Sequence, residues 1–419
     1  MGSVLRQGTS GVQVVSALTR ISVEHTSERK RRSMVETSPP PVLSRRDSRV
    51  PRSAGVPRER FALLDGLRLA AALSVVAFHF TARETDAWAT PISEQAPGVF
   101  DLTKYGVFGV DLFFVISGFV ILMTAWQRPI QDFVASRISR LYPAYWTCVL
   151  LTALILLVDG AHWFRGSDVL INLTMLQEAF GVQHIDGVYW TLWVEMRFYA
   201  LMAVFILIGI SERRLLAFAV CWPIVAAIAE KTHLDFLAYV LVWQHAALFA
   251  GGMIIYLIGR NGHSPLRWLA LGFVTLMAFA TSTPEAAERI LGTTGAGVPS
   301  LAAVAAVFLC FAAVAAVTLT PLRRIRWRWL TLAGALTYPL YLVHEQIGWV
   351  VIRHTQQLGW IPAVLLAALT ALVLAAAVHF LVERRGGRAL RRTLSQDLLR
   401  VQQDPSNRAG AVSAGTEAS

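Results

Sequence analysis

Residues 61–83 read FALLDGLRLAAALSVVAFHFTAR, an apolar stretch long enough to cross a membrane that nevertheless contains Asp65, Arg68 and His79. Each residue of an α-helix turns by about 100°, so residues three or eleven positions apart project from one face. These side chains therefore form a polar stripe along roughly 21 Å of helix axis, at about 1.5 Å per residue. Ionisable side chains inside a membrane face a protein interior or a water-filled cavity, so the stripe predicts a functional site.

The composition of the whole chain is that of a membrane protein. Of its 419 residues, 55% are hydrophobic and only 16% are charged, against about 25% in a soluble domain. The net charge of +11 comes mostly from the two ends, since residues 1–60 hold 12 Lys and Arg against 5 acidic residues and residues 383–419 hold 7 against 4. Basic ends beside a membrane follow the positive-inside bias or contact anionic lipid. We therefore expect the lipid bilayer, and no nucleic acid, as a partner.

Ten apolar stretches of roughly 18–25 residues come after residue 60, and each is a candidate membrane span. Their approximate limits are 61–82, 105–126, 143–159, 188–210, 213–229, 236–259, 266–282, 298–320, 329–352 and 361–382. The loops between them are alternately acidic and arginine-rich. The positive-inside bias then predicts an all-α integral membrane protein with about ten transmembrane helices, both termini in the cytoplasm, and a multi-pass location in the cell (plasma or inner) membrane.

The chain divides into three predicted parts. Residues 1–60 are rich in Ser, Pro and Arg with little to bury, which predicts a disordered basic tail in which Met34 is an alternative start. Residues 61–388 form the predicted transmembrane domain, and 389–419 a second disordered tail. The cysteines Cys148, Cys221 and Cys310 all fall in apolar runs, so we expect them to be core residues.

Four ionisable residues on four different predicted helices fall at a similar depth in the membrane. They are His79, Asp111, Glu195 and His344. A histidine beside a carboxylate suits general-base chemistry, because the carboxylate orients the ring and the ring accepts a substrate proton. We therefore assign catalytic roles to His79, Glu195 and Asp111. The alternative for each residue taken alone is a structural hydrogen bond between helices.

Aromatic residues flank this predicted catalytic layer. The candidates for substrate binding are Tyr189, Trp190, Trp193, Tyr341 and His344, on which a sugar ring could stack. An aromatic belt at the membrane interface is the alternative explanation for the run at 189–193. No grouping of His and Cys has the spacing of metal ligands, so no metal site is predicted.

Arginines mark the opposite depth of the predicted bundle. Arg137 and Arg140 are three residues apart and share a helix face, so their two guanidiniums can grip one anionic group. Arg68 lies in the inner half of the first predicted helix. Together the three arginines predict a site for a phosphate-bearing ligand that binds from the cytoplasm. Ordinary positive-inside arginines are the alternative.

Five sequence blocks, taken in order, resemble the membrane acyltransferase-3 family, which includes O-antigen and nodulation-factor acetylases. The blocks are LDGLRLAAALSVVAFH, GVFGVDLFFVISGFVI, SRISRLYPAYW, YWTLWVEMRFY and YPLYLVH, and the likeness covers about 61–388. It implies a ten-helix fold that takes an acyl group from cytoplasmic acyl-CoA, with acetyl-CoA as the expected donor, and delivers it to a hydroxyl, commonly on a sugar. By position, Arg68 and His79 match the family's Arg-x10-His pair, and Arg137 and Arg140 its Arg-x-x-Arg pair. Glu195 matches the acidic residue that follows the Trp-rich block.

Three positions depart from the family pattern. Leu69 replaces a usual glycine, Met196 a frequent second acid, and Arg385 the proline of a Glu-Arg-Pro signature. We expect these changes to affect packing or substrate preference and not the reaction class.

The resemblance predicts an acyl-CoA-dependent O-acyltransferase acting on a carbohydrate, a glycolipid or a glycosylated metabolite, without the soluble esterase-like domain that some members append. The alternative is a transporter or flippase of a glycolipid or exopolysaccharide precursor. It would equally explain buried charges and would consume no thioester.

Overall fold

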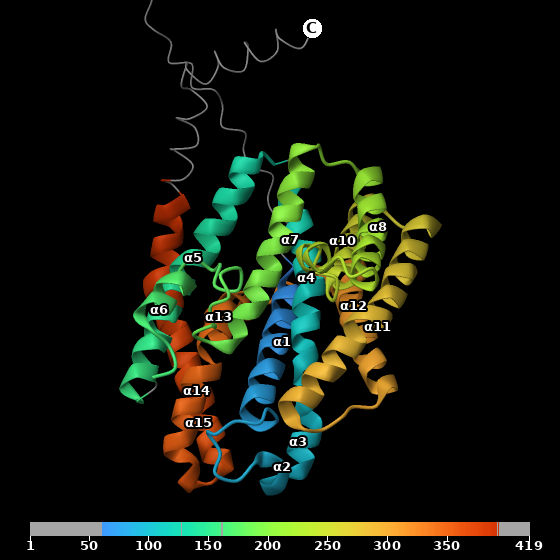
Figure 1. Ribbon diagram of the computed structural model, residues 1–419. Coiled ribbons are helices and arrows are strands. Elements are labelled where there is room, and N and C mark those ends of the chain that lie inside the picture. The colour runs from blue at the N-terminus through green and yellow to red at the C-terminus, as the bar shows by residue number, and fades with distance from the viewer. Residues whose placement is uncertain (1–60, 127, 161, 392, 394–419) are drawn as a thin grey trace, which may run out of the picture. The chain divides into compact units, whose positions relative to one another are not determined.

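The computed structural model describes residues 61–391, with gaps at 127 and 161, together with residue 393. Within this part of the chain every regular element is a helix, and the helices pack side by side (Figure 1). The predicted tail 1–60 and most of the predicted tail 389–419 lie outside the described residues, although the helical backbone continues through 389–391.

Seven helical stretches of the described residues are long and apolar enough to cross a membrane. They are Ala62–Thr81 (α1), Pro97–Ala125 (α3, Pro97–Thr103; η1, Lys104–Val107; α4, Phe108–Ala125), Ile130–Val158 (α5), Gly187–Leu207 (η2, Gly187–Tyr189; α7, Trp190–Leu207), Pro265–Thr294 (α11), Ser300–Leu319 (α12) and Trp360–Arg391, which begins with α15 (Trp360–Ala377). The chain is therefore that of a multi-pass membrane protein, as its composition predicted.

The other three predicted spans also coincide with helices, but these are shorter or more polar. They are α8 (Glu212–Lys231), α10 (Ala246–Asn261) and the pair α13 (Arg328–Val343) and α14 (Glu345–Thr355), which is interrupted at His344. The count of ten transmembrane helices and the side on which the termini lie stay predictions. The end of the bundle where α1 begins is called the proximal end, and the end where α1 finishes is called the distal end.

One helix begins well before its predicted span. α5 begins at Ile130 and not near residue 143, so Arg137 and Arg140, which we expected at the start of the helix, lie two to three turns inside it. The first turns of α5 contain polar residues, so a search for apolar spans did not include these turns. Short helices occupy three connections, namely α2 (Ile92–Gln95), α6 (Gly166–Asn172) and η3 (Pro321–Arg324). The predicted span 236–259 is divided into α9 (Asp235–Val240) and α10, which begins only at Ala246.

α4 is the central helix, and it packs against α10 with the two backbones almost in contact. A Cβ atom on Gly118 of α4 would lie 2.0 Å from the carbonyl oxygen of Phe249, and a Cβ atom on Gly252 of α10 would lie 2.0 Å from that of Val115. Small residues permit this close approach. Membrane helices associate largely through such van der Waals packing, because the hydrophobic effect does not favour helix contacts over lipid contacts. The contact fixes the position of α4, which carries Asp111 and Ser117.

The three cysteines are free thiols, but they do not all lie in the core. Cys148 and Cys310 are buried as expected, whereas Cys221 is exposed on α8. The expectation for Cys221 was wrong because an apolar run does not tell an inward from an outward face when the surroundings are lipid.

We expect Gly252→Ala to lower the melting temperature of the purified protein in detergent. Its methyl group would overlap a backbone carbonyl, which cannot rotate aside as a side chain can, and overpacking of this kind costs about 1–3 kcal/mol. Gly272→Ala in α11 is the matched control, because nothing lies within 4 Å of its Cβ position, and alanine favours a helix over glycine. Equal melting temperatures for Gly252→Ala and the unaltered protein would contradict the close approach.

Candidate functional site

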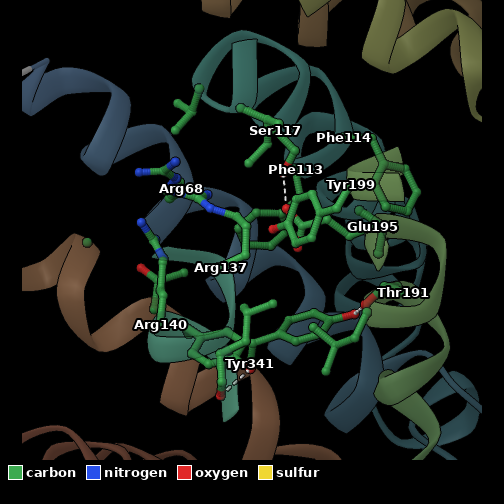
Figure 2. Close-up of a pocket in the computed structure, with 18 residues that line it drawn as sticks. Arg68, Phe113, Phe114, Ser117, Arg137, Arg140, Thr191, Glu195, Tyr199 and Tyr341 are labelled. Atoms are coloured by element: carbon green, nitrogen blue, oxygen red, sulfur yellow. Dashed lines mark hydrogen bonds between the residues drawn. The ribbon is translucent and has the colours of Figure 1, made fainter. Parts of the chain in front are cut away.

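A cavity of about 110 Å³ lies between α1, α4, α5, α7 and α13 (Figure 2). One water needs roughly 10–15 Å³ measured in this way, so the cavity has room for a ligand group of several atoms. Its polar lining includes Arg68, Arg137, Arg140, Glu195, Ser117 and Tyr341. Within the described residues, no cluster of three or more His, Cys, Asp or Glu side chains has the arrangement of a metal site.

All three arginines that the sequence singled out line this cavity. Arg68 is paired with Asp65 one turn earlier on α1, with 3.0 Å between Nη1 and Oδ1. Arg137 is 8% exposed, and its guanidinium lies 5.9 Å from the ring centre of Phe133. The Nε of Arg137 is buried and has no hydrogen-bond partner among the described residues. A buried guanidinium with a spare donor at a cavity is suited to binding an anion.

Glu195 lies in the same cavity as the arginines. Its Oε1 accepts a hydrogen bond from Ser117 Oγ at 2.7 Å (Figure 2). At the start of α7, Thr191 is level with Tyr341, because their hydroxyl oxygens are 2.9 Å apart. Glu195 comes about one turn after Thr191, toward the proximal end. We expected Glu195 at the depth of His79. However, α7 begins level with the end of α13, so each later residue of α7 lies farther from His79, toward the proximal end.

His79 and His344 form a buried pair beyond the distal wall of the cavity. The Nδ1 of His79 is 2.8 Å from the Nε2 of His344, and the two rings meet edge to edge, with 5.0 Å between their centres and 22° between their planes. The Nδ1 of His344 lies 2.9 Å from the carbonyl oxygen of Tyr341. Tyr341 lines the cavity, and its ring centre lies 5.7 Å from that of His344, so its side chain lies between the cavity and the histidine pair. The partner of His79 is therefore the second histidine and not Glu195.

Asp111 is fully buried in a different region. Neither of its carboxylate oxygens has a hydrogen-bond partner among the described residues. Arg289 of α11 interacts with it electrostatically and also lies 4.7 Å from the ring centre of Trp190. His245, which precedes α10, lies beside the same tryptophan, with 5.7 Å between ring centres and 39° between the ring planes.

Sequence reasoning missed both Arg289 and His245, because neither falls in a recognisable motif. The available signal for His245 was a lone histidine in front of an apolar helix, in the stretch WQHAALFAGG. Arg289 is ion-paired with Glu285 one turn earlier on α11. In the sequence this spacing is the same as that of an ordinary surface ion pair, so it gave no sign of a buried role.

Two of the predicted aromatic substrate contacts are used in packing. Tyr189 is fully buried against Tyr145, with 5.1 Å between ring centres. Trp193 donates a hydrogen bond to the hydroxyl of Tyr239, which donates to Glu178 at 2.9 Å. Burial works against ionisation of Glu178, but hydrogen bonds to this carboxylate hold its pKa below the usual range. Of the five predicted substrate residues, only Tyr341 lines the cavity.

An ionic cluster lies just distal to the histidines, and its residues were not predicted. Glu345 is fully buried and accepts a hydrogen bond from Arg83 at 2.8 Å. The guanidinium of Arg83 lies 5.2 Å from the ring centre of Trp349, whose Nε1 donates to the carbonyl oxygen of His79 at 3.0 Å. The distal ion pair thus supports the backbone that carries His79.

Comparison with known proteins gives a consistent set of matches. The model of the acyltransferase domain of the acyltransferase-3 family matches residues 61–381. The chain is 27% identical over 387 residues to BcsY of Komagataeibacter xylinus, a protein described as a membrane-bound transacylase, and the match covers 84% of this chain and 90% of that protein. No solved structure shows significant similarity.

A shorter match links the chain to an enzyme of cell-wall modification. The peptidoglycan O-acetyltransferase OatA of Listeria monocytogenes is 26% identical over 167 residues. The match covers 35% of this chain and 24% of that protein. The similarity is therefore limited to part of the membrane domain and does not extend over the whole of that relative.

We expect Arg83→Met to destabilise the protein, because it leaves the buried Glu345 carboxylate without its cation. Breaking one side of a buried ion pair costs on the order of 3 kcal/mol. The double variant Arg83→Met with Glu345→Gln should recover much of the loss, since a neutral amide costs less to bury than a charge. Melting temperatures of the two single variants and the double variant in detergent measure this coupling. Additive losses would show that the pair is not coupled.

Proposed function

The chain belongs to the acyltransferase-3 family, and from that premise we propose that it moves an acetyl group from acetyl-CoA to a hydroxyl of a carbohydrate, a glycolipid or a glycosylated metabolite. The observation that carries this proposal is the cavity that joins three arginines to the wall of a buried histidine pair. Such an arrangement offers an anion site at one end and a proton acceptor beyond the other.

The arginine end of the cavity is suited to the phosphates of CoA. Arg140 is exposed at the proximal side, while Arg137 is buried with a free donor, so the two can hold one anionic group between surface and interior. From Arg68 to His79 the helix rises about 16 Å, at 1.5 Å per residue over eleven residues. A phosphate-anchored donor must therefore carry a long arm, as the pantetheine of CoA does. Acyl-CoA is cytoplasmic, so we place the proximal end inside and the protein in the plasma or inner membrane.

The proposed transfer uses His79 as the general base. Its ring removes the proton from the acceptor hydroxyl while that oxygen attacks the thioester carbonyl, so that an ester bond forms and the carbon–sulfur bond breaks. The electron pair remains on sulfur, and the CoA thiolate recovers the proton from the imidazolium. General-base assistance of this kind contributes about 10²–10⁴ in rate.

The predicted carboxylates divide between two regions. Glu195 lies in the cavity with the arginines, and we propose that it positions the donor beside Ser117. Asp111 interacts with Arg289, and we propose no proton-transfer role for it. The peptidoglycan acetylation named for one relative supports a sugar-containing acceptor. Release of free thiol from acetyl-CoA separates this function from a transporter, which consumes no thioester.

We expect His79→Ala to lower acetyl transfer by about 10²–10⁴, because it removes the proton acceptor. The measurement is thiol release and transfer from labelled acetyl-CoA with detergent-solubilised protein. His263→Ala is the control, since His263 is exposed beside Trp268 and does not line the cavity. Full activity of His79→Ala would rule out the base role.

Arg137→Ala should raise the KM for acetyl-CoA by roughly tenfold to a hundredfold, because hydrogen bonds to charged groups contribute about 1.5–3 kcal/mol. The kcat at saturating donor should change much less. Arg323→Ala, an exposed arginine in η3, should leave both constants unchanged. An unaltered KM in Arg137→Ala would argue against phosphate binding at this site.

A further inference from the structure

We propose that His344 is a positioning residue that fixes the tautomer of His79 and thereby makes His79 Nε2 the atom that accepts the substrate proton. The proposal rests on the proposed acyl transfer and assigns His344 a role within it in place of the predicted substrate contact.

The direction of the hydrogen bonds is set by one backbone carbonyl, which can only accept. Because the Tyr341 carbonyl oxygen is 2.9 Å from His344 Nδ1, that nitrogen must carry a hydrogen. In a neutral imidazole the other nitrogen then has a lone pair, so His344 Nε2 accepts. His79 Nδ1, at 2.8 Å, must donate to it. His79 Nε2 is left with a free lone pair, which is the requirement for a general base.

The helix break between α13 and α14 makes that carbonyl available. The last carbonyl groups of a helix lack partners within the helix. Here two of them accept from side chains, since the Tyr341 oxygen bonds His344 Nδ1 and the Leu342 oxygen lies 3.4 Å from the Tyr189 hydroxyl. The anchor of His344 is therefore part of the backbone, and its acceptor character does not change with the state of any side chain.

The opposite arrangement would require a charged ring. If His344 carried hydrogens on both nitrogens, its Nε2 would donate to His79 Nδ1, and a neutral His79 would hold its hydrogen on Nε2 and could not act as a base. That state places an imidazolium at a fully buried position, which is costly without a paired anion. The neighbouring Glu345 is already engaged by Arg83. The neutral relay from His79 through His344 to the Tyr341 carbonyl is the arrangement that these contacts favour.

During transfer the relay also keeps its direction. When His79 Nε2 takes the acceptor proton, His79 Nδ1–H continues to donate to His344 Nε2, so no second proton has to move. The proton on Nε2 then passes to the CoA thiolate, and both rings return to their starting state.

Two variants of His344 test the relay, because each keeps one half of the ring's hydrogen bonding. His344→Gln can place its amide oxygen where Nε2 lies and accept from His79 Nδ1–H. His344→Asn can place its amide nitrogen where Nδ1 lies and donate to the Tyr341 carbonyl, but it does not reach His79. We expect the glutamine variant to keep kcat within about tenfold of the unaltered protein. The asparagine variant should lose at least another tenfold, with the KM for acetyl-CoA unchanged in both.

Thiol release and acetyl transfer are measured for both variants beside the unaltered protein and His79→Ala, with melting temperatures to establish folding. Equal kcat values for folded glutamine and asparagine variants, or a folded glutamine variant as inactive as His79→Ala, would overturn the relay. If the asparagine variant does not fold, the glutamine variant alone tests the relay: a kcat within about tenfold of the unaltered protein supports it, and loss of kcat to the level of His79→Ala contradicts it. Absence of thiol release by the unaltered protein would instead refute the proposed function, so the two failures are distinct.

Discussion

The interruption at His344, between α13 and α14, is the constraint on which the site depends. A membrane interior supplies no water, so every backbone group released by a break must find a partner within the protein. The freed carbonyls of α13 accept from His344 and Tyr189, and the amide of Gln346 donates to Asp186 at 3.3 Å. The start of α7 is thereby held against the break, and this contact sets the depth of every later residue on α7.

The polar residues of the bundle consequently form separate layers. The proximal layer contains the arginines and Glu195, and the next contains the histidine pair. The distal layer contains the ion pair of Arg83 and Glu345. Each layer is joined to the next through the backbone or a ring, since Tyr341 links the first two and Trp349 the second and third.

Sequence patterns could predict the arginine site, because its members lie on regular helices. The spacing of Arg137 and Arg140 places both on one face of their helix. The position of Arg68 within the first helix gives its depth in the bundle. The depth of Glu195 could not be obtained in this way, because α7 begins against a break in another helix. The sequence also could not predict which apolar side chains face the protein interior, because apolar residues are equally stable against lipid and in the core. The exposed Cys221 is an example.

Tyr341 and Thr191 line the cavity on the side of the histidines, with their hydroxyl oxygens 2.9 Å apart. Under the proposed function, a donor bound by the arginines has to pass these two side chains to reach His79. The proposed transfer would therefore require the hydroxyl groups of Tyr341 and Thr191 to move apart, so that this single hydrogen bond would control when donor and acceptor meet.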